Sequence, residues 1–199
     1  MPSGPANPVA VRERILSVAT ELFYEHGVHA VGVNEIAARA GASKLSLYKY
    51  FPAKTDLVAA MLAERSDRIH RWLADSTRDA PPGPGRVLSV FDTLIDWFAE
   101  PDYHGCAVVN TVVDTRATPA VAAIARRHLT RYRQLLADRA REAGIREAAA
   151  LARALLLVIE GASVVATIDG DGRSGPDARR AARALLTAYR QRGEVAPAG

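Results

Sequence analysis

Apolar residues recur three and four positions apart along most of this chain, and short Gly- and Pro-rich stretches separate the segments that show this spacing. The first segment, 11–26, places Val11, Ile15, Val18 and Leu22 on one helical face. No segment shows the sustained apolar/polar alternation with β-branched residues that is typical of a strand. The pattern therefore predicts an all-α protein and argues against any fold built on a β-sheet.

Glycine and proline residues that interrupt helices set the expected helix boundaries. Gly27 ends the first helix, Gly41 can take the positive φ of a turn, and the cluster PPGPG at 81–85 forms a loop. We expect a loose tail over 1–7, and helices over 11–26, 34–40, 43–51, from about 54 to the loop at 81, 86–100, 106–115, 119–143, 146–168 and 176–192. These segments leave no long stretch without an assigned structure.

Composition excludes several classes of protein. With 199 residues, 49% of them hydrophobic and 24% charged, the chain can bury a real core and is not intrinsically disordered. Its single cysteine, Cys106, cannot form an intrachain disulfide, and the first residues lack the features of a signal peptide. The longest apolar stretch, 154–168, is interrupted by Glu160 and is too short for a membrane span. We therefore expect a cytoplasmic protein without a membrane partner.

Basic residues are concentrated in one short window. The only three lysines, Lys44, Lys49 and Lys54, lie five residues apart, and with Arg39 they make an acid-free stretch over 36–55. Such a window suits a surface that binds phosphates, because a nearby carboxylate would cancel part of the attraction. The alternative is a solvated helix face without a partner.

The same window contains the spacing of a helix-turn-helix. Ala37 is small where two helices cross, Gly41 supplies the turn, and Leu47 packs the second helix onto the first. This arrangement directs five residues toward the major groove: Lys44, Leu45, Ser46, Tyr48 and Lys49. Lysine can read guanine acceptors and leucine can contact a thymine methyl, whereas the alternative is an ordinary αα-hairpin.

The segment GASKLSLYKYFPAKTDLV, preceded by VNEIAARA and an amphipathic first helix, resembles the TetR family of bacterial transcriptional regulators. The resemblance implies an N-terminal three-helix helix-turn-helix DNA-binding domain, 1–54, and a C-terminal helical domain for ligand binding and dimerisation, 55–199. It makes 44–50 the recognition helix, with Tyr48 in contact with a phosphate, and adds Tyr50 and Lys54 to the DNA-binding residues. Ser43, which also suits the N-cap of this helix, is counted among the DNA-binding residues. Val33 stands where the family often has a capping Thr or Ser, so Asn34 is the alternative cap and DNA contact.

The resemblance also implies a small-molecule effector of unknown identity. The sequence offers a lining of Phe91, Ile95, Trp97, Phe98, Tyr103, Cys106, Asn110, Leu136 and Ile159, with Asn110, Asp114 or Glu160 to orient a ligand. The alternative is that these aromatic residues, which recur at helical spacing, belong to the hydrophobic core and line no pocket. Cys106 either senses oxidants from a helix N-terminus or is a buried, inert thiol.

We expect a homodimer built from the last two helices. The interface residues are Leu155, Val164, Val165, Leu185, Leu186 and Tyr189. Two such helices from each subunit make a four-helix interface, and its two-fold symmetry suits a palindromic operator. Together these features predict a DNA-binding regulator, a repressor that a small hydrophobic effector releases from double-stranded DNA.

Two competing functions remain, and each leaves a feature unexplained. An all-helical enzyme would not account for the basic window, and an architectural DNA-binding protein would not need the large C-terminal part. His26 and His29 bracket a turn without further ligands, so we expect no metal site, no cofactor and no catalytic residues.

Overall fold

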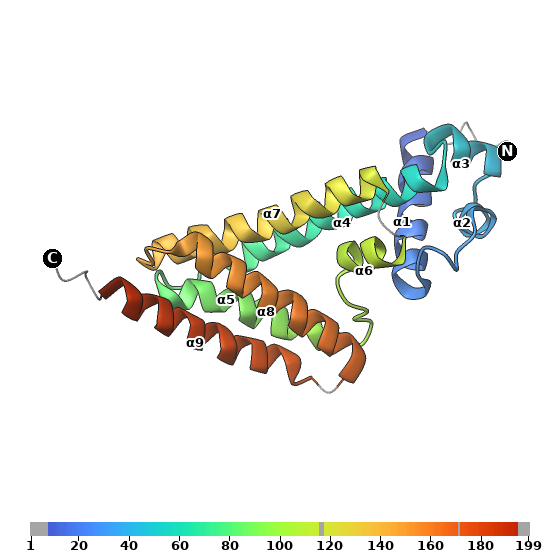
Figure 1. The fold of residues 1–199 in the computed structure, drawn as a ribbon. Coiled ribbons are helices and arrows are strands. Elements are labelled where there is room, and N and C mark those ends of the chain that lie inside the picture. Colours follow the sequence, from blue (N-terminus) through green and yellow to red (C-terminus); the bar gives the residue numbers. More distant parts are fainter. Residues whose placement is uncertain (1–7, 116–117, 171, 195–199) are drawn as a thin grey trace. The chain divides into compact units, whose positions relative to one another are not determined.

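The computed structural model describes residues 8–115, 118–170 and 172–194, and these contain nine α-helices and no strand (Figure 1). The all-α prediction is confirmed, whereas the expected loose tail at 1–7 lies outside the described residues. The chain divides into two compact units. Unit 1 comprises Met1–Asp67 with Ala107–Ala125, and unit 2 comprises Arg68–Cys106 with Arg126–Gly199.

Unit 1 contains the N-terminal helices α1 (Pro8–His26), α2 (Val33–Arg39) and α3 (Lys44–Tyr50), the first part of α4 (Lys54–Ser76), α6 (Ala107–Asp114), and the start of α7 (Pro119–Glu142). The expected apolar stripes form its core: Ile15, Leu22, Ile36, Leu47 and Leu57 are almost fully buried. Helix α1 packs against both α2 and α3. This packing is what fixes α3 relative to the rest of unit 1.

Unit 2 contains the remainders of α4 and α7 together with α5 (Pro84–Phe98), α8 (Ala148–Asp169) and α9 (Ser174–Glu194). Helix α9 packs against both α5 and α8. Its core is built from one face of each helix, including Leu73, Phe91, Leu136, Leu155 and Leu186. The two halves of α4 and α7 thus belong to different units, so covalent helices lead from one unit into the other.

The start of α9 differs from the expected boundary. The helix begins at Ser174, two residues before Pro176, because proline is tolerated in a first helical turn. A Cβ atom at Gly175 would come within 2.8 Å of the Ile95 side chain and 3.0 Å of its Cα. Glycine therefore permits the close approach of α9 to α5, a constraint that the turn-like sequence around it conceals.

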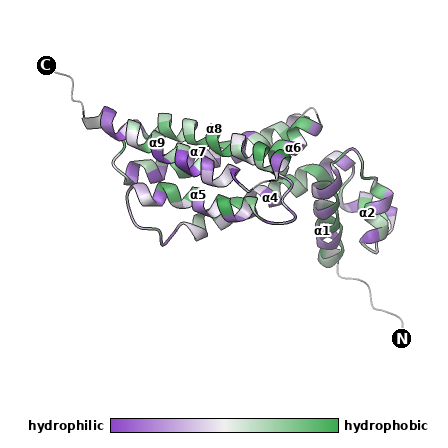
Figure 2. Ribbon diagram, turned by 90° about the horizontal axis from the view of Figure 1, so that it is seen from below, coloured by the Kyte–Doolittle hydropathy of each residue, from purple (hydrophilic) through white to green (hydrophobic). Residues whose placement is uncertain are grey.

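Helix α8 is long and apolar enough to cross a membrane by length and composition, the only such helix among the described residues. Hydropathy colouring shows green along much of it (Figure 2). Seven of its residues are nevertheless buried in unit 2, including Leu151, Leu155 and Ile159. We interpret α8 as a core helix whose remaining apolar residues form a surface.

Candidate nucleic-acid interface and buried polar cluster

The turn between α2 and α3 is held by the backbone pattern of a helix end. Gly41 has a φ of 57°, and its N–H bonds the carbonyl of Ala38 at 3.1 Å. The N–H of Ala42 bonds the carbonyl of Ala37 at 2.9 Å. These two bonds satisfy carbonyls that the end of α2 would otherwise leave unpaired. The positive φ explains why glycine stands at the turn position of the helix-turn-helix.

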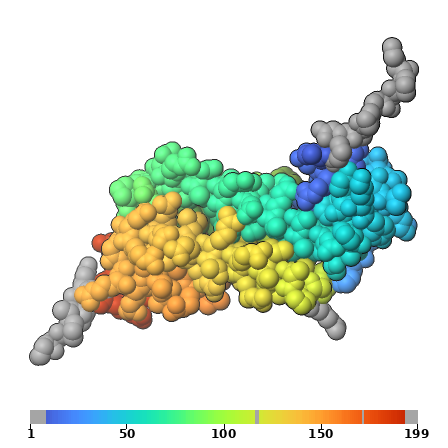
Figure 3. Space-filling view, turned by 90° about the horizontal axis from the view of Figure 1, so that it is seen from above, coloured from blue at the N-terminus to red at the C-terminus, as the bar shows by residue number. Residues whose placement is uncertain are grey.

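Helix α3 begins as the sequence predicted. The Ser43 side chain accepts a hydrogen bond from the Ser46 N–H at 3.0 Å, which caps the helix. Leu47 is fully buried against unit 1, so the opposite face points to solvent. Lys44, Leu45, Tyr48 and Lys49 are exposed there, while Ser46 and Tyr50 are partly buried. Figure 3 shows the α2–α3 segment, light blue to cyan, at the surface of unit 1.

The expectation for the start of α2 was wrong. Gly32 is the N-cap residue, in an extended conformation and without a side-chain cap. Asn34 lies in the first turn of the helix, exposed, and therefore does not cap it. Instead, the Gly32 carbonyl accepts the backbone N–H groups of Glu35 and Ile36 at 3.1 and 3.2 Å. The structure thus leaves the Asn34 side chain at the surface of unit 1.

Two cations of the basic window also bond within unit 1. The Lys54 ammonium donates to the Val28 carbonyl at 2.6 Å and lies 5.7 Å from the centre of the Phe23 ring. Arg39 pairs with Glu35 at 3.1 Å, just outside the acid-free stretch. An ammonium has three donors, so Lys54 can hold the α1–α2 turn and still approach a phosphate.

Sequence reasoning missed the contact between α6 and the same turn. Asp114, expected to orient a ligand, instead accepts a hydrogen bond from the Val28 N–H at 3.0 Å through its side chain. Its backbone carbonyl lies 2.8 Å from Nε2 of His29. The two partners are more than 80 residues apart in sequence, and no local pattern indicates the pairing. Hydrogen bonds therefore join the end of helix α6 directly to the turn between α1 and α2.

The expected effector-lining residues are divided between core and surface roles. Phe91, Trp97, Phe98, Leu136 and Ile159 lie in the buried core of unit 2, and Tyr103 is partly buried against it. The remaining members have other surroundings: Ile95 packs against Gly175, Cys106 is buried, and Asn110 belongs to unit 1. The structure thus brings together the aromatic members of the set but not all of it.

A buried polar cluster that the sequence did not reveal surrounds Cys106. Nε2 of His70 lies 3.1 Å from both the carbonyl oxygen and Nδ1 of His128, and Nε2 of His128 lies 3.6 Å from Sγ of Cys106. A carbonyl only accepts, so the His70 nitrogen must carry the hydrogen, and Nδ1 of His128 must accept it. Neutral His128 then carries its proton on Nε2 and donates it toward the Cys106 sulfur.

Burial keeps the His128 ring of this cluster uncharged. Desolvation, helped by His70 and by Arg131, lowers the pKa of His128 from 6.5 to about 3. His128 therefore holds its proton toward the sulfur instead of accepting one from the thiol. The i, i+4 spacing of His128 and Tyr132 on α7 was the available sequence signal, because it places both polar groups on one helical face.

Two more acidic groups of unit 2 have raised pKa values: Tyr132, which is buried, and Glu160, which is partly buried. Desolvation, followed by the nearby acidic groups of Cys106, Glu160 and Tyr103, raises the pKa of Tyr132 well above its usual value. Desolvation also raises the pKa of Glu160 from 4.5 to about 7. The Tyr103 hydroxyl lies 2.7 Å from Oγ of Ser163, one turn along α8 from Glu160. Residues from α4, α7, α8 and the α5–α6 connection thus converge on this cluster.

The expected dimer residues differ in exposure. Leu155 and Leu186 are buried in the core of unit 2, so they hold α8 and α9 within one chain and present no surface. Leu185 and Tyr189 are partly buried against that core. Val164 and Val165 are exposed, and with Leu157, Gly161 and Ile168 they form one stripe along α8, which we call the α8 stripe. The spacing of its members is that of a single helical face.

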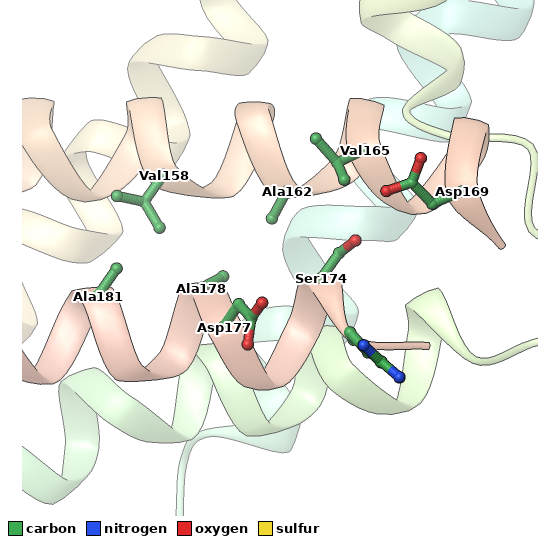
Figure 4. A pocket seen from close by; sticks show the side chains of 9 residues that line it. Val158, Ala162, Val165, Asp169, Ser174, Asp177, Ala178 and Ala181 are labelled. Carbon is green, nitrogen blue, oxygen red and sulfur yellow. The ribbon is translucent and has the colours of Figure 1, made fainter. Parts of the chain in front are cut away.

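A groove lies beside the α8 stripe, between α8 and α9. Small side chains from both helices, Ala162, Ala178 and Ala181, leave it open. Asp169 stands at one end and Asp177 lies beside Ala178 (Figure 4). Val165 belongs both to the groove and to the stripe. No group of three or more His, Cys, Asp or Glu side chains among the described residues is arranged to hold a metal ion.

A helix-turn-helix with an exposed basic face, followed by a second all-helical unit, defines a DNA-binding transcriptional regulator. A family model described as bacterial regulatory proteins of the tetR family matches residues 15–61. A second, the C-terminal domain of LmrA/YxaF-like transcriptional regulators, matches residues 85–174. The chain belongs to the TetR family of transcriptional regulators and is not an enzyme.

Individual relatives agree with this assignment. A TetR-family regulator from Streptomyces coelicolor superposes with a TM-score of 0.84 at 25% identity, covering 91% of this chain and 96% of that one. A TetR-type regulator from Streptomyces avermitilis gives 0.78 at 31% identity, covering 90% and 97%. The transcriptional activator FasR from Mycolicibacterium smegmatis is 33% identical over 98 residues, 49% of this chain. That match spans only 44% of FasR, less than half of its length.

Proposed function

We propose that the protein is a dimeric, effector-controlled repressor that binds a palindromic operator in the cytoplasm. The observation that carries the proposal is the α3 face, where Lys44, Leu45, Tyr48 and Lys49 are exposed on a helix capped by Ser43 and anchored by Leu47. In this proposal residues 1–54 recognise DNA, and residues 55–199 bind the effector and dimerise. The two copies of α3 then lie about 34 Å apart, one turn of DNA.

The named α3 residues have separate roles in the proposal. Lys44 reads guanine acceptors, and Leu45, the most exposed large apolar side chain described at 83%, contacts a thymine methyl. Tyr48, Lys49 and Lys54 contact phosphates and position the helix. Ser46, Tyr50 and Asn34 complete the surface that faces the DNA.

Control by a small molecule is supported by the family and by the buried polar groups of unit 2. Among similar structures, a regulator from Saccharomonospora viridis, 20% identical, was solved with bound choline. Relatives include both an activator and a repressor, the latter from Streptomyces coelicolor. Release of the operator is the direction we propose, with the contact between Asp114 and Val28 as part of the route into the helix-turn-helix.

The first test selects operator DNA from a genomic library and measures its affinity by gel shift. We expect Lys44→Ala to weaken binding by about 1 to 3 kcal/mol and to relax the base preference at one position. Tyr48→Phe should weaken binding evenly across sequences, because a phosphate contact carries no base information. Arg183→Ala, which removes an exposed cation on α9, is the matched control and should bind as the wild type does.

The outcomes separate the parts of the proposal. Unchanged affinity for both α3 variants would contradict the assignment of α3 as the recognition helix. A reporter gene under the selected operator shows the direction of control: higher expression without the protein supports repression, and lower expression contradicts it.

A further inference from the structure

Helices α7 and α8 enclose a second groove, near the short connection that joins them (Figure 1). It has a volume of about 340 Å³, and we call it the α7–α8 groove. Its lining residues are Thr130, Arg133, Gln134, Ala137 and Arg141 of α7, and Ala149, Ala152 and Arg153 of α8. The lining therefore contains three arginines and no carboxylate.

Two of these arginines lack an acidic neighbour on their own helix. The positions three and four residues before and after Arg133 and Arg153 hold only leucine, alanine and threonine. Among the described residues, no carboxylate forms a salt bridge with either guanidinium. Other arginines of unit 2 pair with a carboxylate one turn away, as Arg180 does with Asp177. The α7–α8 groove thus holds two cations without the usual neutralising partner.

The third arginine is already neutralised. Arg141 pairs with Asp138, one turn earlier on α7. The Gln134 amide donates to the same carboxylate at 3.0 Å. Asp138 is not part of the groove lining, and both of its partners are. The positive charge left for a ligand is therefore that of Arg133 and Arg153.

A neutral hydroxyl holds Arg133 in position. The guanidinium donates to Oγ1 of Thr130 at 2.9 Å, and the Thr130 hydroxyl donates to the Arg126 carbonyl at 2.8 Å. A guanidinium has five N–H donors, so Arg133 keeps donors for a further partner. A side chain that is held before binding also loses less conformational entropy when a ligand arrives.

These features fit an anion with about two charges. A groove lined by charges of one sign concentrates the electrostatic potential and attracts ions of the opposite sign. The planar guanidinium bonds phosphate oxygens through two parallel N–H groups. A phosphate monoester carries up to about two negative charges near neutral pH, which matches the two arginines without a carboxylate partner.

We propose that the α7–α8 groove binds a small organic phosphate. The phosphate lies between Arg133 and Arg153, and the organic part covers Ala137 and Ala152, whose side chains are buried and form the floor. A volume of about 340 Å³ lies in the range of small-molecule sites, which favours a free phosphate ester over a nucleic-acid backbone. The site goes beyond the proposed function, because it lies in unit 2 and includes no residue of α3.

The test titrates the full-length protein calorimetrically with phenyl phosphate, phenyl sulfate and inorganic phosphate, at constant ionic strength and at about pH 7.5. Phenyl sulfate has the same shape with one negative charge fewer, so phenyl phosphate should bind at least about tenfold more tightly. Inorganic phosphate lacks the ring that covers the alanines and should also bind more weakly than phenyl phosphate. Equal affinity in the first comparison would overturn the dianion, and equal affinity in the second would overturn the organic part.

Two groove variants test the location. Arg133→Gln and Arg153→Gln should each weaken phenyl phosphate binding by about tenfold, because each removes one guanidinium from the phosphate. Both side chains are exposed, so the melting temperatures without the probe should equal that of the wild type. Arg183→Gln, at an exposed arginine of α9 outside the groove, is the matched control and should bind the probe normally. Unchanged binding in both groove variants, or an equal loss in the control, would overturn the site.

Operator binding separates the two sources of phosphate. Gel shift without phenyl phosphate should give Arg153→Gln the operator affinity of the wild type, because a small-molecule site makes no contact with DNA. A loss of operator affinity would assign the groove to nucleic-acid phosphates and overturn the proposal. A protein that selects no DNA refutes the proposed function alone, since the titration with phenyl phosphate does not depend on an operator.

Discussion

At the scale of single residues, Glu160 links the stability of unit 2 to pH. Burial raises its pKa from 4.5 to about 7, so the folded protein holds a proton that the unfolded chain has already lost between these values. Stability that depends on this proton is therefore present below the unfolded pKa and is lost as the pH rises through about 7. Above that range the carboxylate is charged, partly buried and unpaired.

We predict that Glu160→Gln stabilises the protein in a pH-dependent manner. At about pH 8 the variant avoids the buried charge, and its free energy of unfolding should exceed that of the wild type by up to about 3 kcal/mol. At about pH 5 the wild-type carboxyl is protonated and resembles the amide, so the two proteins should be nearly equal. Urea denaturation of both proteins at the two pH values measures the difference, and an equal gain at both would contradict the role of ionisation.

At the scale of elements, the length of α3 makes its cap important. Seven residues cannot form a stable helix alone, so α3 depends on the Ser43 cap and on the burial of Leu47. Loss of the bond between the Ser43 oxygen and the Ser46 N–H leaves a helical donor without its partner. Fraying of this first turn would move Lys44 and Leu45 away from the base edges that we expect them to read.

We therefore predict that Ser43→Ala destabilises unit 1 by about 1 kcal/mol and weakens operator binding. Ser43→Asn should restore both, because asparagine caps helices as well as serine does. Both variants lack the serine hydroxyl, so a direct contact of that hydroxyl with DNA would instead weaken both equally. Thermal unfolding and gel shift on the three proteins distinguish the two outcomes.

The elements that could be predicted are those that local chemistry determines. Gly27 and Gly41 end helices through positive φ, and Ser43 caps α3 through its own side chain. The start of α9 was not predicted because glycine is needed at position 175 for close packing against Ile95, which is distant in sequence, and not for a local turn. The Asn34 cap failed for a related reason: the Gly32 carbonyl already accepts the first N–H groups of α2.

At the scale of the whole molecule, the buried cluster shows the limit of sequence reasoning. Its members, His70, Tyr103, His128, Tyr132 and Glu160, come from four separate segments, and only tertiary packing makes them neighbours. Glu160 was noticed because it interrupts an apolar run, whereas the others resemble ordinary residues of amphipathic helices. The same limit applied to Leu155 and Leu186, because an apolar residue in a rich stripe can face either its own core or a partner.

The exposed fractions of the side chains on α8 distinguish the residues that face the core of their own chain from those that face outward. Leu157 and Ile168 at the ends of the α8 stripe are 75% and 76% exposed, and Val164 and Val165 are about half exposed. Gly161 has no neighbour within 4 Å of a Cβ position, so another helix can approach the middle of the stripe closely. We propose that this stripe is the dimer contact, because contiguous exposed apolar surface is typical of interaction sites. A second copy of α8, related by a two-fold axis, would place the same residues on both sides.

We predict that Ile168→Glu separates the dimer and lowers operator affinity by about a hundredfold to ten-thousandfold. Each monomer would keep its contacts with one half-site, but the gain from engaging two half-sites at once would be lost. Val113→Glu is the matched control, since Val113 on α6 is also 76% exposed but lies outside the α8 stripe. Analytical ultracentrifugation should show a dimer for the wild type and for the control, and a monomer for Ile168→Glu, with gel shift reporting the affinity of each. Full operator affinity from a monomeric variant would show that a single α3 suffices, and a dimeric Ile168→Glu would place the interface elsewhere.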